Sequence, residues 1–235
     1  MTKRTAESSP RPSARVIGVV YLLYFVLAIG GEMLARGMVL AGDPAATSTN
    51  LLAHERLFRL SMAVGLMGTA LYIAVTVLFY GLFRSVSPTA ARLAAFFSLT
   101  GCAVQACGDL FQAAPFVILE GSPYLNVFTA EQLHAAALTC IKLNVQAVYI
   151  YLVFFGLFNF HIGYLIFKST YLPRILGVLM GLSGVGWLTF LSPVLARQFL
   201  PPIEIVGILA EAALMLWLLV KGVNVERWKE KTSAA

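Results

Sequence analysis

The residues best suited to chemistry in this chain are acidic and basic side chains that interrupt long hydrophobic runs. Glu211 is the clearest case, because Lys221 follows it by ten residues, or about 15 Å along a helix. A carboxyl in apolar surroundings is costly to ionise, so it is either neutral or paired. We expect Glu211 to be protonated at neutral pH and hydrogen-bonded to a neighbouring helix, with Gln105 as its partner. It is then either a site for a proton, cation or ligand, or a structural carboxyl between helices.

A second group of polar side chains gathers toward one end of several hydrophobic runs. Glu32 and Arg36 show the favourable spacing of an acid four residues before a base on a helix, and Asp109 shares a helical face with Gln105. We expect Arg36 or Arg59 to approach Glu32, Glu55 or Asp109 within hydrogen-bonding distance. Two interpretations are open: a polar pocket that accepts a ligand, or an interhelical network that fixes packing. The predicted ligand-binding residues are Glu32, Arg36, Arg59, Asp109 and Glu211.

Other chemistries find no support in the motifs of the chain. The three histidines and three cysteines show no metal-ligand spacing, so no metal site is predicted. A phosphate-binding Walker loop, a dinucleotide glycine fingerprint and a Gly-x-Ser-x-Gly motif are all missing from the sequence. The sequence therefore predicts no cofactor and no catalytic residue.

The composition indicates the kind of protein that must position these side chains. Hydrophobic residues make up 59% of the chain and charged residues 12%, and the mean hydropathy is +0.82. A soluble fold of this size has too little interior to hide so much apolar surface. The composition predicts a membrane protein whose main partner is the lipid bilayer, and it excludes a collagen, a disulfide scaffold, a disordered chain and a nucleic-acid binder.

Hydrophobic runs divide the chain into six candidate membrane spans. A bilayer core about 30 Å thick needs roughly 20 apolar residues in a helix, and the runs cover residues 16–35, 57–83, 93–119, 143–167, 175–195 and 203–220. Pro193 should break the fifth run, and residues 42–50 should form a polar loop. We predict an all-α, six-helix transmembrane domain over residues 16–221. A disordered cytoplasmic tail, residues 1–15, precedes it, and a cytoplasmic tail, residues 222–235, follows it.

The basic residues give this bundle an orientation. If the N-terminus is cytoplasmic, all but five of the 17 Lys and Arg residues fall in cytoplasmic segments. Because cytoplasmic loops of membrane proteins carry the excess of Lys and Arg, this distribution predicts that both termini are cytoplasmic. The five basic residues on the outer side are Arg36, Arg56, Arg59, Lys142 and Arg197.

The region around the fourth and fifth runs resembles a known family. Residues 163–169 (GYLIFKS) and 171–179 (YLPRILGVL), with residues 18–23 (GVVYLL) near the N-terminus, are similar to the bacterial domain of unknown function 4386 family. The resemblance extends from Arg15 to about Val220. It implies a multi-pass protein of the bacterial cytoplasmic membrane without an established activity, and it supplies no catalytic residues.

Three functional hypotheses follow from these observations. The leading one is a binding or transport-like module with an outward-facing polar pocket for an unknown small molecule. The alternatives are an intramembrane enzyme that acts on a lipid, with Asp109 or Glu211 as acid or base, and an accessory subunit of another membrane protein. An exposed small-residue face on the fifth helix, where Gly177 and Gly181 are four residues apart, would favour the accessory subunit.

Overall fold

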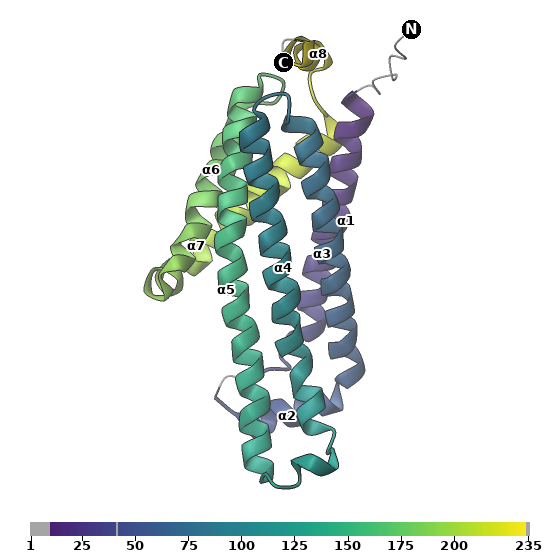
Figure 1. Cartoon of the computed structure of the whole chain (residues 1–235), viewed down its shortest axis with the longest axis vertical. Helices are drawn as coiled ribbons and strands as arrows, with labels where there is room; N and C mark the ends of the chain where they lie inside the picture. The colour runs from purple at the N-terminus through teal and green to yellow at the C-terminus, as the bar shows by residue number, and fades with distance from the viewer. Residues whose placement is uncertain (1–9, 41, 234–235) are drawn as a thin grey trace. The chain divides into compact units, whose positions relative to one another are not determined.

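A computed structural model describes residues 10–40 and 42–233, and every regular element within them is a helix (Figure 1). The elements are α1 (Pro10–Ala35), α2 (Pro44–Ala53), α3 (Glu55–Phe83), α4 (Pro88–Leu119), η1 (Pro123–Leu125), α5 (Ala130–Ser169), α6 (Arg174–Leu188), η2 (Thr189–Leu191), α7 (Pro193–Val220) and α8 (Val225–Ser233). The all-α class is confirmed. Of the predicted N-terminal tail, residues 1–9 lie outside the described residues, and α1 begins at Pro10.

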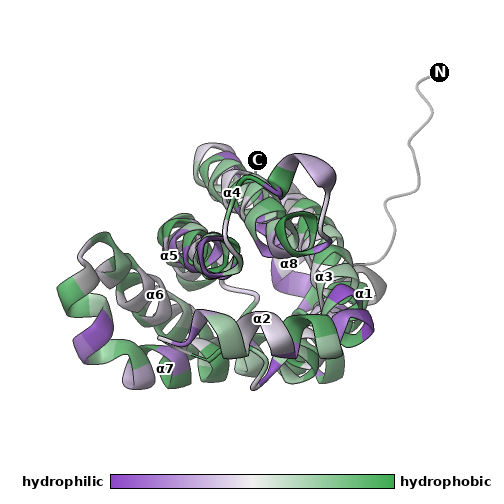
Figure 2. Cartoon of the chain, turned by 90° about the horizontal axis from the view of Figure 1, so that it is seen from below, coloured by the Kyte–Doolittle hydropathy of each residue, from purple (hydrophilic) through white to green (hydrophobic). Residues whose placement is uncertain are grey.

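Six segments within the described residues are long and apolar enough to cross a membrane, as predicted. They are Ala14–Ala35, Glu55–Phe83, Pro88–Leu119, Ala130–Ser169, Arg174–Leu191 and Val194–Val220. Hydrophobic residues dominate the ribbons of these long helices (Figure 2), and large apolar side chains such as Leu110 and Leu209 are 71% and 62% exposed. A soluble protein rarely leaves so much apolar surface in water, whereas lipid covers it in a bilayer.

Helix ends follow local chemistry and correct two of the predicted boundaries. The carboxylate of Asp43 accepts a hydrogen bond from the backbone N–H of Ala46 at 2.9 Å, and Pro44 occupies the first turn, so α2 replaces most of the loop predicted for residues 42–50. The predicted break at Pro193 is confirmed, since α6 ends at Leu188 and α7 begins at Pro193. Helix α7 therefore starts before residue 203, the predicted position.

The chain divides into two compact units, and α1, α3, α4 and α5 contribute residues to both. Unit 1 comprises Met1–Leu22, Leu71–Gly101 and Leu152–Ala235, and unit 2 comprises Leu23–Ala70 and Cys102–Tyr151. In unit 1, α6 and α7 lie against each other (Figure 1). In unit 2, a buried hydrophobic cluster contains Met38, Leu51, Phe58, Phe116 and Ile141.

Glycines bring α5 and α6 into backbone contact within unit 1. A Cβ atom on Gly156 would lie 2.8 Å from the carbonyl oxygen of Gly184, and a Cβ atom on Gly163 would lie 2.6 Å from that of Gly177. Real Cβ atoms do not approach so closely, so only glycine fits at this antiparallel contact. The small-residue face of α6 that includes Gly177 is therefore covered by α5 of the same chain. Gly181 differs, because no described atom of a neighbouring helix lies within 4 Å of a Cβ atom placed on it.

Candidate functional site

Glu211 lies on α7 in the interior of unit 1 and is only 5% exposed. Its Oε2 atom accepts a hydrogen bond of 2.8 Å from the hydroxyl of Tyr21 on α1, and its Oε1 atom accepts one of 3.1 Å from the Nδ2 atom of Asn159 on α5. The expected hydrogen bond to a neighbouring helix is confirmed. The expected partner was wrong, because Gln105 donates instead to Asp109 in unit 2, at 2.8 Å.

Asn159 connects Glu211 to a third neighbouring helix. Its Nδ2 atom also donates to Ser183 Oγ on α6 at 3.3 Å. Its Oδ1 atom is buried and accepts no hydrogen bond from any described residue. Two carboxyl oxygens, an amide nitrogen and two hydroxyls thus come together from four helices. We call Tyr21, Asn159, Ser183 and Glu211 the Glu211 centre.

Aromatic rings pack around the Glu211 centre and make its surroundings apolar. The Tyr21 ring meets those of Tyr72 and Phe79 edge-on, with centroids 6.2 Å and 5.9 Å apart. Trp187 packs so closely on α7 that its Cζ2 atom is 2.5 Å from the position of a Cβ atom on Gly207, one turn before Glu211. Rings cannot solvate a charge as water does, so Glu211 must either hold a proton or, when ionised, be compensated by a cation or a positively charged ligand group.

No cationic side chain within the described residues offers this compensation, since the two ion pairs found there involve neither oxygen of Glu211. The hydrogen-bond donors to Glu211 are both neutral groups. The arrangement is therefore suited to a carboxyl that holds a proton, or exchanges it for a cation or a positively charged group. Oxygen donors of this kind are the ligands that hard cations prefer.

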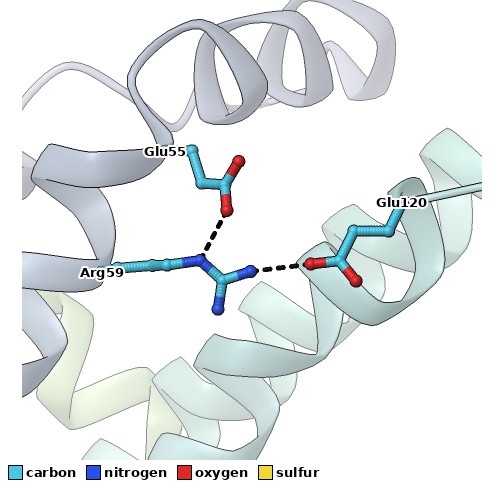
Figure 3. A network of polar contacts seen from close by, with 3 residues as sticks. All are labelled: Glu55, Arg59 and Glu120. Carbon is cyan, nitrogen blue, oxygen red and sulfur yellow. Dashed lines mark hydrogen bonds and ion pairs between the residues drawn. The ribbon is translucent and has the colours of Figure 1, made fainter.

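Arg59 forms the other polar cluster, on the surface of unit 2 (Figure 3). Its Nε atom donates to Glu55 at 2.6 Å, and its Nη2 atom donates to Glu120, directly after α4, at 2.7 Å. The guanidinium also lies 4.6 Å from the centroid of the Phe116 ring. The expected approach of Arg59 to Glu55 is confirmed. Because about half of the Arg59 side chain is exposed, this cluster (Glu55, Arg59 and Glu120) is open to a charged ligand.

The other predicted site residues belong to neither the Glu211 centre nor the cluster around Arg59. Asp109 is hydrogen-bonded to Gln105, four residues earlier on α4. Glu32, on α1, and Arg36, directly after it, are exposed and form no ion pair in the part of the chain that the structure describes. Four of the five predicted residues thus belong to unit 2, and Glu211 belongs to unit 1. The described residues hold no group of three or more His, Cys, Asp or Glu side chains that could bind a metal ion.

Tyr21, Asn159 and Ser183 were not among the predicted site residues. Each is a polar residue inside a hydrophobic run, and polar side chains inside membrane spans usually pair with one another. That rule could have marked all three as candidates. It could not have shown that they meet at Glu211, since Tyr21 and Glu211 are 190 residues apart in the sequence.

The fold and the buried carboxyl define a class: a multi-pass membrane protein with six apolar helices and a polar centre inside one of its units. The family model described as "Domain of unknown function (DUF4386)" matches residues 16–222. The chain belongs to this family, which confirms the resemblance found in the sequence. Comparisons with curated proteins and with solved structures gave no match.

Proposed function

We propose that this protein is a binding or transport-like module of the bacterial cytoplasmic membrane, with both termini in the cytoplasm. In this proposal Glu211 takes up and releases a proton in exchange for a cation or a positively charged ligand group. Glu32, Arg36, Arg59 and Asp109 are the proposed outward-facing ligand-binding residues, of which the two acids, Glu32 and Asp109, attract a positive charge. The observation that supports the proposal is the burial of Glu211 among neutral hydrogen-bond donors.

A purely structural role would not require an acid at this position. A glutamine could accept the hydrogen bond from Asn159 with its amide oxygen and donate one to the Tyr21 hydroxyl oxygen, without the risk of a buried charge. The carboxyl adds one capability, which is to gain and lose a proton. The buried Oδ1 atom of Asn159 supports the same conclusion, because it leaves an acceptor available for a water, a cation or a ligand donor.

The two alternatives have weaker support. An intramembrane enzyme would need an activated nucleophile, and the hydroxyl of Ser183 faces a hydrogen-bond donor, Asn159, rather than a base that could remove its proton. An accessory subunit was expected to present the glycine face of α6 to its partner, and α5 covers Gly177 and Gly184 on that face.

Infrared difference spectroscopy on the reconstituted full chain tests the proposal. The protonated-carboxyl band of Glu211 should change when the pH is stepped and when Na⁺ or K⁺ is added. Glu211→Gln should remove this change. Glu204→Gln is the matched control, since Glu204 is an exposed acid on the same helix, and it should leave the band intact.

Proteoliposomes that contain a pH-sensitive dye then test transport. An imposed Na⁺ or K⁺ gradient should drive proton movement in the wild type and in Glu204→Gln, but not in Glu211→Gln. A Glu211 band that stays constant under every pH and cation condition would identify a structural carboxyl. It would refute the proposal.

A further inference from the structure

We propose that the turn between α5 and α6 binds the phosphate headgroup of an anionic phospholipid. The binding residues are Lys168, Arg174 and Arg227, which we call the basic turn. All three belong to unit 1, and the proposal is independent of any role of Glu211.

The position of the turn in the sequence favours a lipid headgroup. One membrane span ends at Ser169 and the next begins at Arg174, so the four residues between them lie at the boundary of the membrane. Lipid phosphates occupy this level of a bilayer, and clustered Lys and Arg residues there attract anionic lipids.

Two of the cations lie over aromatic rings on one face of α5. The Nζ atom of Lys168 is 5.3 Å from the centroid of the Tyr164 ring, and the Cζ atom of Arg174 is 5.4 Å from that of Phe167. Tyr164 and Phe167 are three residues apart, so they are neighbours on the helix. Both rings are nearly half exposed, at 43% and 48%. The face thus offers positive charge and an adjacent apolar surface.

Arg227 on α8 supplies the third cation. Its Nη1 atom donates to the backbone oxygen of Thr170 at 3.1 Å, which places the guanidinium directly at the turn. Arg227, Lys168 and Arg174 are all exposed, and none forms an ion pair within the described residues. Their positive charges are therefore available to an external anion.

The turn itself is held in place by buried contacts, so the site exists before a lipid arrives. Thr170 adopts a left-handed backbone conformation, with φ of 62°. The next residue, Tyr171, is buried, and its hydroxyl donates to the backbone oxygen of Leu82 at 2.8 Å. The backbone N–H of Asn224, just before α8, donates to the backbone oxygen of Tyr171 at 3.1 Å. Preorganisation of this kind lowers the entropic cost of binding.

The aromatic rings distinguish a lipid from a free phosphate. An arginine fork matches two oxygens of a phosphate group in either molecule. Only a lipid also has acyl chains that can cover the exposed rings of Tyr164 and Phe167. We therefore assign the site to an anionic phospholipid such as phosphatidylglycerol.

The test uses the full chain in phosphatidylcholine vesicles with spin-labelled phosphatidylglycerol or spin-labelled phosphatidylcholine as probe. Electron paramagnetic resonance gives the relative affinity of the protein for the two lipids. We expect the wild type to prefer phosphatidylglycerol. Each single substitution, Lys168→Gln, Arg174→Gln or Arg227→Gln, should lower that preference about fivefold. The triple variant should approach no preference.

Two controls separate a specific site from general attraction. Arg56→Gln/Arg84→Gln/Arg197→Gln removes the same charge from exposed positions elsewhere and should keep most of the preference. Lys168→Arg retains the charge at its position and should keep the preference of the wild type, which also tests folding at the turn. The proposal is overturned if the two triple variants lose the preference equally, or if the basic-turn variant keeps it. It is also overturned if inorganic phosphate displaces the probe, since the site would then bind free phosphate.

Discussion

Replacing Glu211 by leucine should destabilise the protein, whereas replacing it by glutamine should not. Leucine removes the acceptor for the Tyr21 hydroxyl and for Asn159 Nδ2, which lie 2.8 Å and 3.1 Å from the carboxyl oxygens. A buried donor that loses its partner costs about 1–3 kcal/mol. We expect Glu211→Leu to lower the free energy of unfolding by that amount. Glu211→Gln should change it by less than about 1 kcal/mol, because the amide oxygen can accept from Asn159 while the amide nitrogen donates to the Tyr21 hydroxyl oxygen.

A double-mutant cycle isolates the hydrogen bond from Tyr21. Tyr21→Phe removes the hydroxyl and retains the ring that packs on Tyr72 and Phe79. Interhelical hydrogen bonds in membrane proteins average about 0.6 kcal/mol and reach about 1.7 kcal/mol. Combined with Glu211→Leu, this variant should show a coupling energy of about that size.

The assay is reversible unfolding of the purified protein in mixed micelles, followed by circular dichroism. Glu204→Leu is the control, because it makes the same change at an exposed position of α7 and should not destabilise the protein. The reasoning is refuted if Glu211→Leu is as stable as Glu211→Gln, or if the cycle gives no coupling energy.

Three further predictions concern packing, pH and orientation. Gly163→Ala should lower the free energy of unfolding by about 1–3 kcal/mol, because its Cβ atom would lie 2.6 Å from the α6 backbone. Gly181→Ala is the control and should be neutral. Equal effects of the two variants in the unfolding assay would contradict the packing argument. Burial raises the pKa of Tyr171, so above about pH 10 the unfolded chain loses a proton that the folded protein keeps, and stability should fall as pH rises. Unfolding measured against pH should show a smaller fall for Tyr171→Phe, and parallel curves would contradict the assignment. If both termini are cytoplasmic, an impermeant thiol reagent outside intact cells should label Ser122→Cys but not Ser87→Cys. Labelling of Ser87→Cys would contradict the predicted orientation.

The sequence predicted those features that depend on neighbouring residues. A hydrophobic run has to match the thickness of a bilayer, so the six spans could be placed from apolar residues alone. The pair of Glu55 and Arg59 follows from a spacing of four on one helix. The break at Pro193 follows from the backbone chemistry of proline.

Contacts between distant segments could not be predicted in this way. Glu120, the second partner of Arg59, is 61 residues away in the sequence, and Asn159 is 52 residues from Glu211. Hydrophobic periodicity fixes which residues face the interior of a helix bundle, but not which helices are neighbours. Gln105 was expected to reach Glu211 because it is a polar residue at a suitable depth, and depth alone cannot choose between helices.

The glycines of α5 and α6 explain why two polar residues of the Glu211 centre, Asn159 and Ser183, can be short. Asn159 lies between Gly156 and Gly163, three and four residues away, and therefore on the face of α5 that contacts α6. Ser183 is next to Gly184 on the facing helix. Because backbone atoms of the two helices touch at the glycines, an asparagine and a serine are long enough to meet at 3.3 Å. A wider helix pair would require longer and more mobile side chains, and the Nδ2 atom that orients the Glu211 carboxyl would be less firmly held. The packing of the helices and the chemistry proposed for Glu211 therefore depend on the same glycines.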